Sequence, residues 1–119
     1  MLFDFETGRE ITKAPYPKSF KLLEDRLSPT ELDEARAVLN AKIEGIEIHT
    51  AGWMPGADWT GTAFQPIYSK AALKNQELAA KLFGLLVWDV FVKHEERWFT
   101  GRFEVHGKDI GSRTYFRAT

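Results

Sequence analysis

Apolar and polar positions alternate in two runs at the C-terminal end of the chain, which predicts a β-hairpin over residues 97–117. The runs meet at a Gly-Lys pair, 107–108, and glycine in the first position of a two-residue turn is typical of type II′ hairpins. This turn pairs Phe99 with Phe116. The register sorts phenylalanine and aliphatic side chains to one face, and a shift of one residue would undo the sorting. We therefore expect this face to pack on the protein core.

The opposite face of the predicted hairpin gathers tryptophan, tyrosine and arginine side chains. On it lie Trp98, Arg102, Arg113, Tyr115 and Arg117. These residue types are enriched at protein-binding hot spots, and aromatic rings interleaved with guanidinium groups also stack bases and hold phosphates. The same composition fits a face that only covers the sheet. We expect this face to be exposed and to bind a partner.

Helical spacing of apolar residues predicts two main helices. Residues 28–31 (SPTE) combine a capping serine, a proline for the first helical position and a glutamate for a capping box, so an amphipathic helix is expected at about 29–43. A second helix is expected at about 76–94. It is polar only along a narrow stripe, and a helix that is apolar on most sides is buried on most sides. This helix would form the centre of the core or half of a homodimer interface. As an alternative to the helix, residues 86–92 could form a strand.

These elements predict an α+β fold in a single domain, residues 1–119. A small antiparallel sheet, which includes the hairpin at 97–117, would pack on the long apolar helix. Residues 46–50 (IEIHT) alternate and predict a further strand with Ile46 and Ile48 directed inward. A short helix is expected at 19–26. Residues 1–18 are expected to be irregular or edge-like, because the APYP segment disfavours regular structure.

The segment HTAGWMPGADWTGTAF, residues 49–64, places two tryptophans and a methionine among three glycines and a proline. Long loops in compact domains are usually functional or packed down on the core. Trp59, which leads into the following helix, is expected to close the core. Trp53 and Met54 lie on a stiff turn before a proline, and we expect them to contact a partner.

Composition narrows the function classes. The 119 residues include no cysteine, which excludes disulfides, thiolate metal sites and thiol nucleophiles. No signal peptide is visible at the N-terminus and no apolar run has the length of a membrane span, so a cytoplasmic protein without membrane contact is expected. Sixteen basic and seventeen acidic residues give a net charge of −1. This total gives no support for a dedicated duplex-binding protein.

Catalytic signatures are missing from the sequence. The three histidines do not occur at metal-ligand spacing, and the chain has no nucleophile elbow, phosphate-binding loop or dinucleotide-binding glycine motif. We therefore expect no metal, no cofactor and no enzymatic activity.

The segments AGWMPGADWTGTAFQPIY, KLFGLLVWDVF and TYFR make residues 48–117 resemble small uncharacterised proteins of phages and other mobile elements. The resemblance implies a short, cofactor-free protein that binds a host or defence component, as anti-CRISPR proteins do. It assigns no site residue. The sequence thus predicts a non-enzymatic protein-binding or inhibitor module, and a nucleotide-binding or single-stranded nucleic-acid-binding protein is the alternative.

Overall fold

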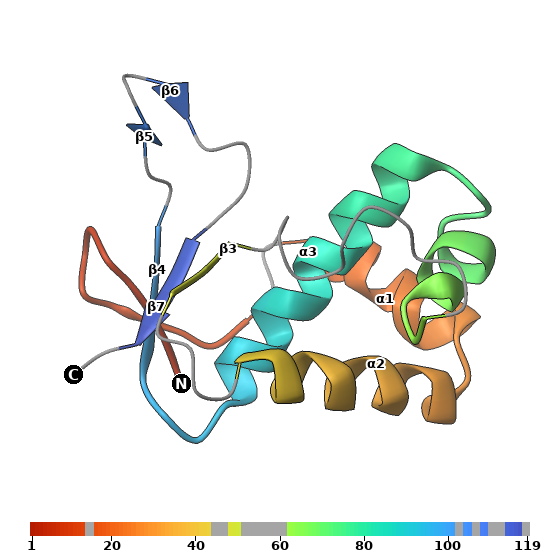
Figure 1. Ribbon diagram of the computed structural model, residues 1–119, viewed down its shortest axis with the longest axis horizontal. Coiled ribbons are helices and arrows are strands. Elements are labelled where there is room, and N and C mark those ends of the chain that lie inside the picture. The colour runs from red at the N-terminus through yellow and green to blue at the C-terminus, as the bar shows by residue number, and fades with distance from the viewer. Residues whose placement is uncertain are drawn as a thin grey trace.

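The computed structural model confirms an α+β fold, in which the helices gather on one side of a five-stranded sheet (Figure 1). The structure describes the backbone of residues 1–13, 16–43, 48–50, 62–101, 104–105, 108–109 and 114–117.

The sheet has the strand order β2-β1-β4-β7-β3. The bounds are Leu2–Asp4 for β1, Glu10–Ile11 for β2, Ile48–Thr50 for β3, Trp98–Gly101 for β4 and Thr114–Arg117 for β7. Strands β1 and β4 run parallel and the other neighbours run antiparallel. The sheet is therefore mixed, and the prediction of an antiparallel sheet is wrong in this respect.

The parallel pair arises because the N-terminal segment, expected to be irregular or edge-like, forms the edge strand β2 and the interior strand β1. The Met1 amino group donates hydrogen bonds to the carbonyl oxygens of His94 and, at 2.9 Å, Glu96. The Trp98 amide donates to the Met1 carbonyl at 2.8 Å. These bonds start β1 beside the start of β4. Strand β1 thereby becomes an interior strand between β2 and β4.

The predicted register of the hairpin is confirmed in β4 and β7, where Phe99 pairs with Phe116 and Trp98 pairs with Arg117. It does not continue to the tip. Strands β5 (Glu104–Val105) and β6 (Lys108–Asp109) form a separate two-stranded sheet that stands away from the main one (Figure 1). There Val105 pairs with Lys108, so the two residues between the strands are 106–107 instead of 107–108. The segment between β6 and β7 is two residues longer than the segment between β4 and β5.

The helices are α1 (Pro17–Arg26), α2 (Pro29–Ile43), the short π-helix η2 (Ile67–Ala71) and α3 (Gln76–Lys93). The predicted bounds of α2 are confirmed, while α1 begins two residues earlier than expected. Because α3 is continuous, the alternative of a strand over residues 86–92 is wrong.

Side-chain caps explain where α2 and α3 begin. The Glu31 amide donates to Ser28 Oγ at 3.1 Å and the Ser28 amide donates to Glu31 Oε1 at 3.0 Å, which is the reciprocal pair of a capping box. Asn75 Oδ1 accepts a hydrogen bond from the Leu78 amide at 3.0 Å and caps α3. Both caps satisfy amide groups that have no partner inside the helix.

Helix α3 is the centre of the core. Nine of its residues are buried, and α1, α2, η2 and the sheet all contact it. On its polar stripe, Asp89 binds Arg36 of α2 and, at 3.1 Å, Lys93. The Trp88 indole donates to the Lys13 carbonyl at 3.2 Å. A single chain therefore covers this apolar helix, and the alternative in which α3 forms half of a dimer interface is not needed.

Candidate protein-binding surface

The inner face of the sheet, which packs against α3, carries the tryptophan and tyrosine side chains. The ring of Phe91 in α3 stacks on the Tyr115 ring with 4.2 Å between centroids and an angle of 11°. It also contacts the Trp98 ring at 4.8 Å. Trp98 is 0% exposed and Tyr115 is 1% exposed. The prediction that these two residues point outward to a partner is therefore wrong.

There is a physical reason why Trp98 and Tyr115 were predicted on the wrong side of the sheet. Alternation sorts the residues of a strand into two groups, but it does not say which group turns toward the helices. Large aromatic side chains remove much apolar area from water when they are buried. In this sheet the indole and phenol rings lie against α3, and Thr100, which pairs with Tyr115 in the register, is also buried.

The other predicted contact residues are only partly located. Arg117 lies in β7 at the register position opposite Trp98, and the structure does not describe its side chain. Trp53 and Met54 of the tryptophan segment, together with Arg102 and Arg113, lie outside the described residues. So do Ile46 and Trp59, and the side chain of Ile48.

The outer face of the sheet carries a row of phenylalanine rings across three adjacent strands. Phe3 of β1 pairs with Phe99 of β4, which pairs with Phe116 of β7. The ring centroids lie 6.0 Å apart for the first pair and 5.6 Å apart for the second. The Phe5 ring meets the Phe99 and Phe116 rings edge-on, at 6.3 Å and 5.2 Å. We call these four residues the outer Phe cluster.

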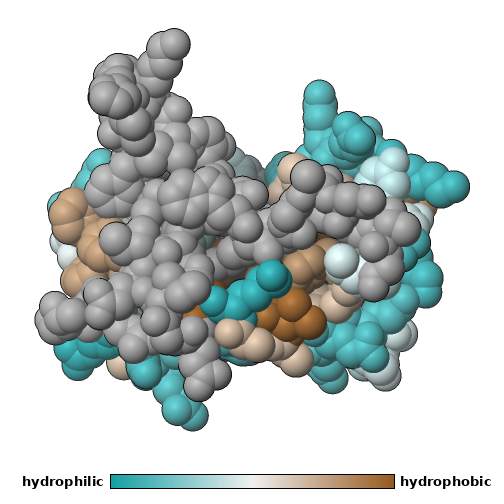
Figure 2. All heavy atoms as spheres, viewed as in Figure 1, coloured by the Kyte–Doolittle hydropathy of each residue, from teal (hydrophilic) through white to brown (hydrophobic). Residues whose placement is uncertain are grey.

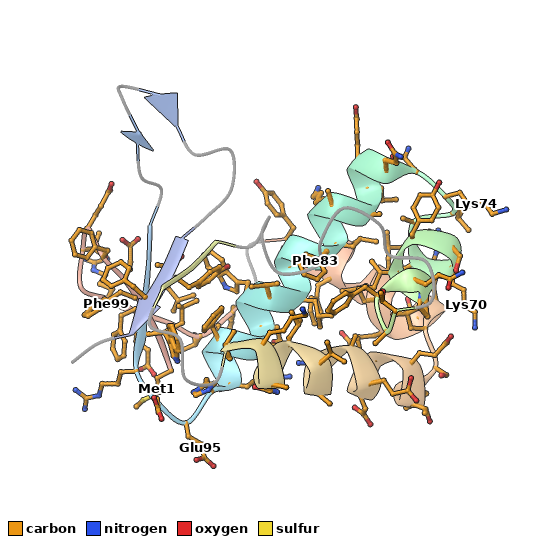
Figure 3. The ribbon with its side chains drawn as sticks, viewed as in Figure 1. Met1, Lys70, Lys74, Phe83, Glu95 and Phe99 are labelled. Atoms are coloured by element: carbon orange, nitrogen blue, oxygen red, sulfur yellow. The ribbon has the colours of Figure 1, made fainter. Side chains whose placement is uncertain are left out.

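Phe99 lies on the side of the sheet away from the helices (Figure 3). Tilted and edge-to-face arrangements at these distances are the ones that aromatic pairs favour. Phe3, Phe99 and Phe116 are partly exposed, and Phe5 is 54% exposed. Figure 2 shows apolar atoms at the surface on this edge of the molecule. The sheet therefore presents aromatic rings to solvent on the face that the helices do not cover.

A hydrogen-bonded turn holds Phe5 in place. The Phe5 amide donates to the Thr100 carbonyl at 3.0 Å and extends the pairing of β1 with β4. The Asp4 side chain accepts from the Glu6 amide at 2.8 Å, and the Asp4 carbonyl accepts from the Gly8 amide at 2.8 Å. Gly8 has a φ of +71°, which favours glycine. The exposed ring therefore stands on a well-defined backbone.

The charges beside the outer Phe cluster are balanced. Glu10 pairs with Phe3 in the register and extends the row into β2. Arg97 precedes β4 by one residue, and Glu6 and Arg9 belong to the turn that follows β1. All four side chains are exposed. Two acids and two bases give this described rim no excess of positive charge.

The sequence contains a signal for a strand that carries Phe3 and Phe5. In LFDF, residues 2–5, the phenylalanines occupy alternate positions, which places both on one face of a strand. The segment is short and lies near APYP, which favours irregular or edge-like structure. The same alternation rule that predicted the C-terminal hairpin would have found this strand.

Several other charged groups of the described chain form contacts within the fold. Asp89 fixes α2 to α3 through Arg36. Lys70 Nζ lies 2.6 Å from Glu31 Oε2, and this hydrogen bond, with that of the Ser28 amide, lowers the pKa of the Glu31 carboxyl. Burial lowers the pKa of the Met1 amino group. A groove of about 380 Å³ between α1 and α2 mixes aliphatic and charged side chains.

Within the part of the chain that the structure describes, no group of three or more histidine, aspartate or glutamate residues is arranged to hold a metal ion. No helix among the described residues is long and apolar enough to cross a membrane.

Comparison with known proteins finds no relative. No family model matches the chain, and no curated protein or solved structure is significantly similar to it. The functional proposal therefore rests on the geometry of the outer Phe cluster.

Proposed function

We propose that the chain is a small non-enzymatic protein-binding or inhibitor module that contacts its partner through the outer Phe cluster. The observation that supports this is an array of four phenylalanine rings on the sheet face opposite the helices, of which Phe5 is 54% exposed and the other three are partly exposed. Contiguous exposed apolar patches on soluble proteins mark interaction sites more often than scattered apolar residues do. Aromatic side chains are enriched at protein interfaces.

The resemblance to phage proteins gives the proposal a specific form, a phage-encoded inhibitor of a host defence component that acts in the manner of anti-CRISPR proteins. A cytoplasmic location is part of this form, because a chain without cysteine suits a reducing compartment. In this form Trp53 and Met54 are additional contact residues.

Two matched variants test the proposed surface. Phe5→Asp places a charge on the outer Phe cluster at a side chain that is 54% exposed. Leu73→Asp places the same charge on a side chain that is 67% exposed, beside Lys74, at the end of the molecule opposite Phe99 (Figure 3). Each protein is immobilised and used to capture partners from host lysate, with and without nuclease. We expect Phe5→Asp to lose a captured protein that wild type and Leu73→Asp retain.

Equal capture by Phe5→Asp and wild type would contradict the proposal. Circular dichroism and thermal unfolding of both variants show whether each one folds. A partner that disappears with nuclease treatment would point to the nucleic-acid alternative.

That alternative has one observation in its favour, because aromatic rings on adjacent strands of a sheet can also stack successive bases. The balanced rim of Glu6, Arg9, Glu10 and Arg97 disfavours it, since phosphate binding depends on clustered positive charge. Binding of a labelled oligonucleotide at several salt concentrations decides between the two. Affinity that falls steeply and linearly on a log–log scale would support nucleic-acid binding, and no binding at low salt would exclude it for that oligonucleotide.

A further inference from the structure

We infer that the corner between α3 and β4, residues 94–97, is a pH-sensitive joint, in which protonation of the His94 imidazole weakens the attachment of β1 to β4. Strand β1 carries part of the outer Phe cluster. The assembly of the cluster is thereby linked to pH, whether or not a foreign protein binds it.

The His94 side chain takes part in the turn that ends α3. Its Nδ1 atom accepts a hydrogen bond from the Glu96 amide at 3.1 Å, and the His94 amide donates to the Phe91 carbonyl at 3.2 Å. A ring nitrogen accepts a hydrogen bond only when it carries no proton. The half-buried ring also lies edge-on to the Trp98 indole, with 5.9 Å between centroids. The fold therefore holds the neutral form of His94, with its proton on Nε2.

The same corner attaches the start of β1. The Met1 amino group donates to the carbonyl oxygens of His94 and, at 2.9 Å, Glu96. The Met1 carbonyl accepts from the Trp98 amide at 2.8 Å, and the parallel pairing of β1 with β4 follows directly. A change in the turn at residues 94–97 therefore reaches the bonds that hold β1 in the sheet.

Protonation reverses the role of Nδ1, because a charged imidazole donates from both ring nitrogens. The Nδ1 proton would then face the Glu96 N–H, so that a hydrogen bond is replaced by two opposed donors. The charge would also be added to a residue whose carbonyl oxygen already binds the Met1 amino group. Like charges disfavour one another at short distance. Both effects make the protonated form unfavourable in the folded corner.

Other charged groups around the corner do not reverse this preference. In the described part of the chain they lie at the end of α3, in the corner itself and on β2, where one acid is close enough to act on the Met1 amino group. They are Lys93, Glu95, Glu96, Arg97 and Glu10. All five side chains are exposed, and exposed charges are screened by water and salt. The lost hydrogen bond, which lies within the turn, therefore decides the outcome.

Stability should fall as the pH falls. A histidine in an unfolded chain takes up a proton below about pH 6.5. Because the folded corner disfavours that proton, the unfolded state binds more protons in this range, and the free energy of unfolding decreases. Above about pH 6.5 both states are neutral at this residue, and the stabilisation by the Nδ1 hydrogen bond is fully present.

Thermal unfolding of wild type and His94→Asn between about pH 8 and about pH 5 tests the inference. Asparagine is the matched control, because its side-chain oxygen also accepts from the amide two residues on and does not titrate. We expect the wild-type melting temperature to fall by about 4 °C more than that of His94→Asn, the shift for one lost hydrogen bond in a domain of this size. His49 and His106 are present in both proteins, so their titration cancels in the difference.

If His94→Asn does not fold, His94→Ser replaces it, because a serine oxygen accepts the same amide more weakly. Equal losses of melting temperature in wild type and the folded variant would overturn the inference. So would nitrogen-15 NMR of wild type that places the His94 proton on Nδ1 at about pH 8, because that nitrogen would then be a donor.

Amide hydrogen exchange tests the link to β1. After correction for the intrinsic rate at each pH, protection of the Trp98 amide should fall roughly fivefold more in wild type than in the variant. Equal changes in protection would show that protonation does not reach the bond between Trp98 and Met1, and would overturn the inference. Neither measurement involves a partner, so failure of the joint and failure of the proposed function are separate results.

Discussion

Both faces of the sheet carry aromatic side chains, but these side chains differ in how far they are buried. On the inner face, Trp98 and Tyr115 are buried against Phe91 of α3. On the outer face, the Phe99 and Phe116 rings contact each other and the Phe5 ring, and both stay partly exposed. The difference comes from the helices, which lie on one side of the sheet. An aromatic ring in a strand is thus buried in the core or partly exposed according to the side on which the helices pack.

Removal of the buried Trp98 indole is expected to have the largest effect and tests the difference between the two faces. Trp98→Ala should lower the free energy of unfolding by about 3–5 kcal/mol, the range for large aromatic side chains removed from a core. Phe5→Ala should lower it by less than about 1 kcal/mol, because its ring is more than half exposed. Urea or guanidinium denaturation of the two variants and wild type measures both values. Equal losses for the two variants would mean that the faces do not differ in the way described.

A smaller effect is expected in the helices, where the contribution of Glu31 to stability should depend on pH. The hydrogen bond from Lys70, with that from the Ser28 amide, lowers the pKa of Glu31 below its ordinary value of 4.5. A lowered pKa in the folded state contributes stability above the ordinary value, and this contribution is lost as pH falls through the folded value. Glu31→Gln should therefore be less stable than wild type at neutral pH. The difference should shrink below pH 4.5.

Phe5→Ala is the control for that titration, because no charge is removed from the outer face. Its difference from wild type should stay constant over the same pH range. Thermal unfolding at several pH values measures both differences. A stability difference between Glu31→Gln and wild type that does not depend on pH would show that the Lys70–Glu31 ion pair contributes nothing to folding.

Local signals in the sequence predicted much of the fold. The capping box at Ser28 and Glu31 fixed the start of α2, and alternation fixed the pairing of Phe99 with Phe116. Such signals depend on neighbours in sequence or on one turn. The parallel pairing of β1 with β4 depends instead on contacts between residues more than 90 positions apart.

The candidate site was harder to predict than the fold. Register places Trp98 and Phe99 on opposite faces, but only the three-dimensional position of α3 decides which of them is buried. Phe3 and Phe5 join the outer face because β1 inserts beside β4. No local pattern encodes that insertion. The sequence therefore predicted an exposed face with Trp98 and Tyr115 on this hairpin, whereas the structure buries these two residues and leaves Phe99 and Phe116 partly exposed.

Footprinting of the aromatic side chains with hydroxyl radicals, in dilute solution, tests the central claim most directly. Indole and phenol rings react readily when water reaches them, so their protection is informative. We predict that Phe5 is modified while Trp98 and Tyr115 are protected until the protein unfolds. Rapid modification of Trp98 and Tyr115 in the folded protein, with Phe5 protected, would contradict the account and return the contact surface to the opposite face of the sheet.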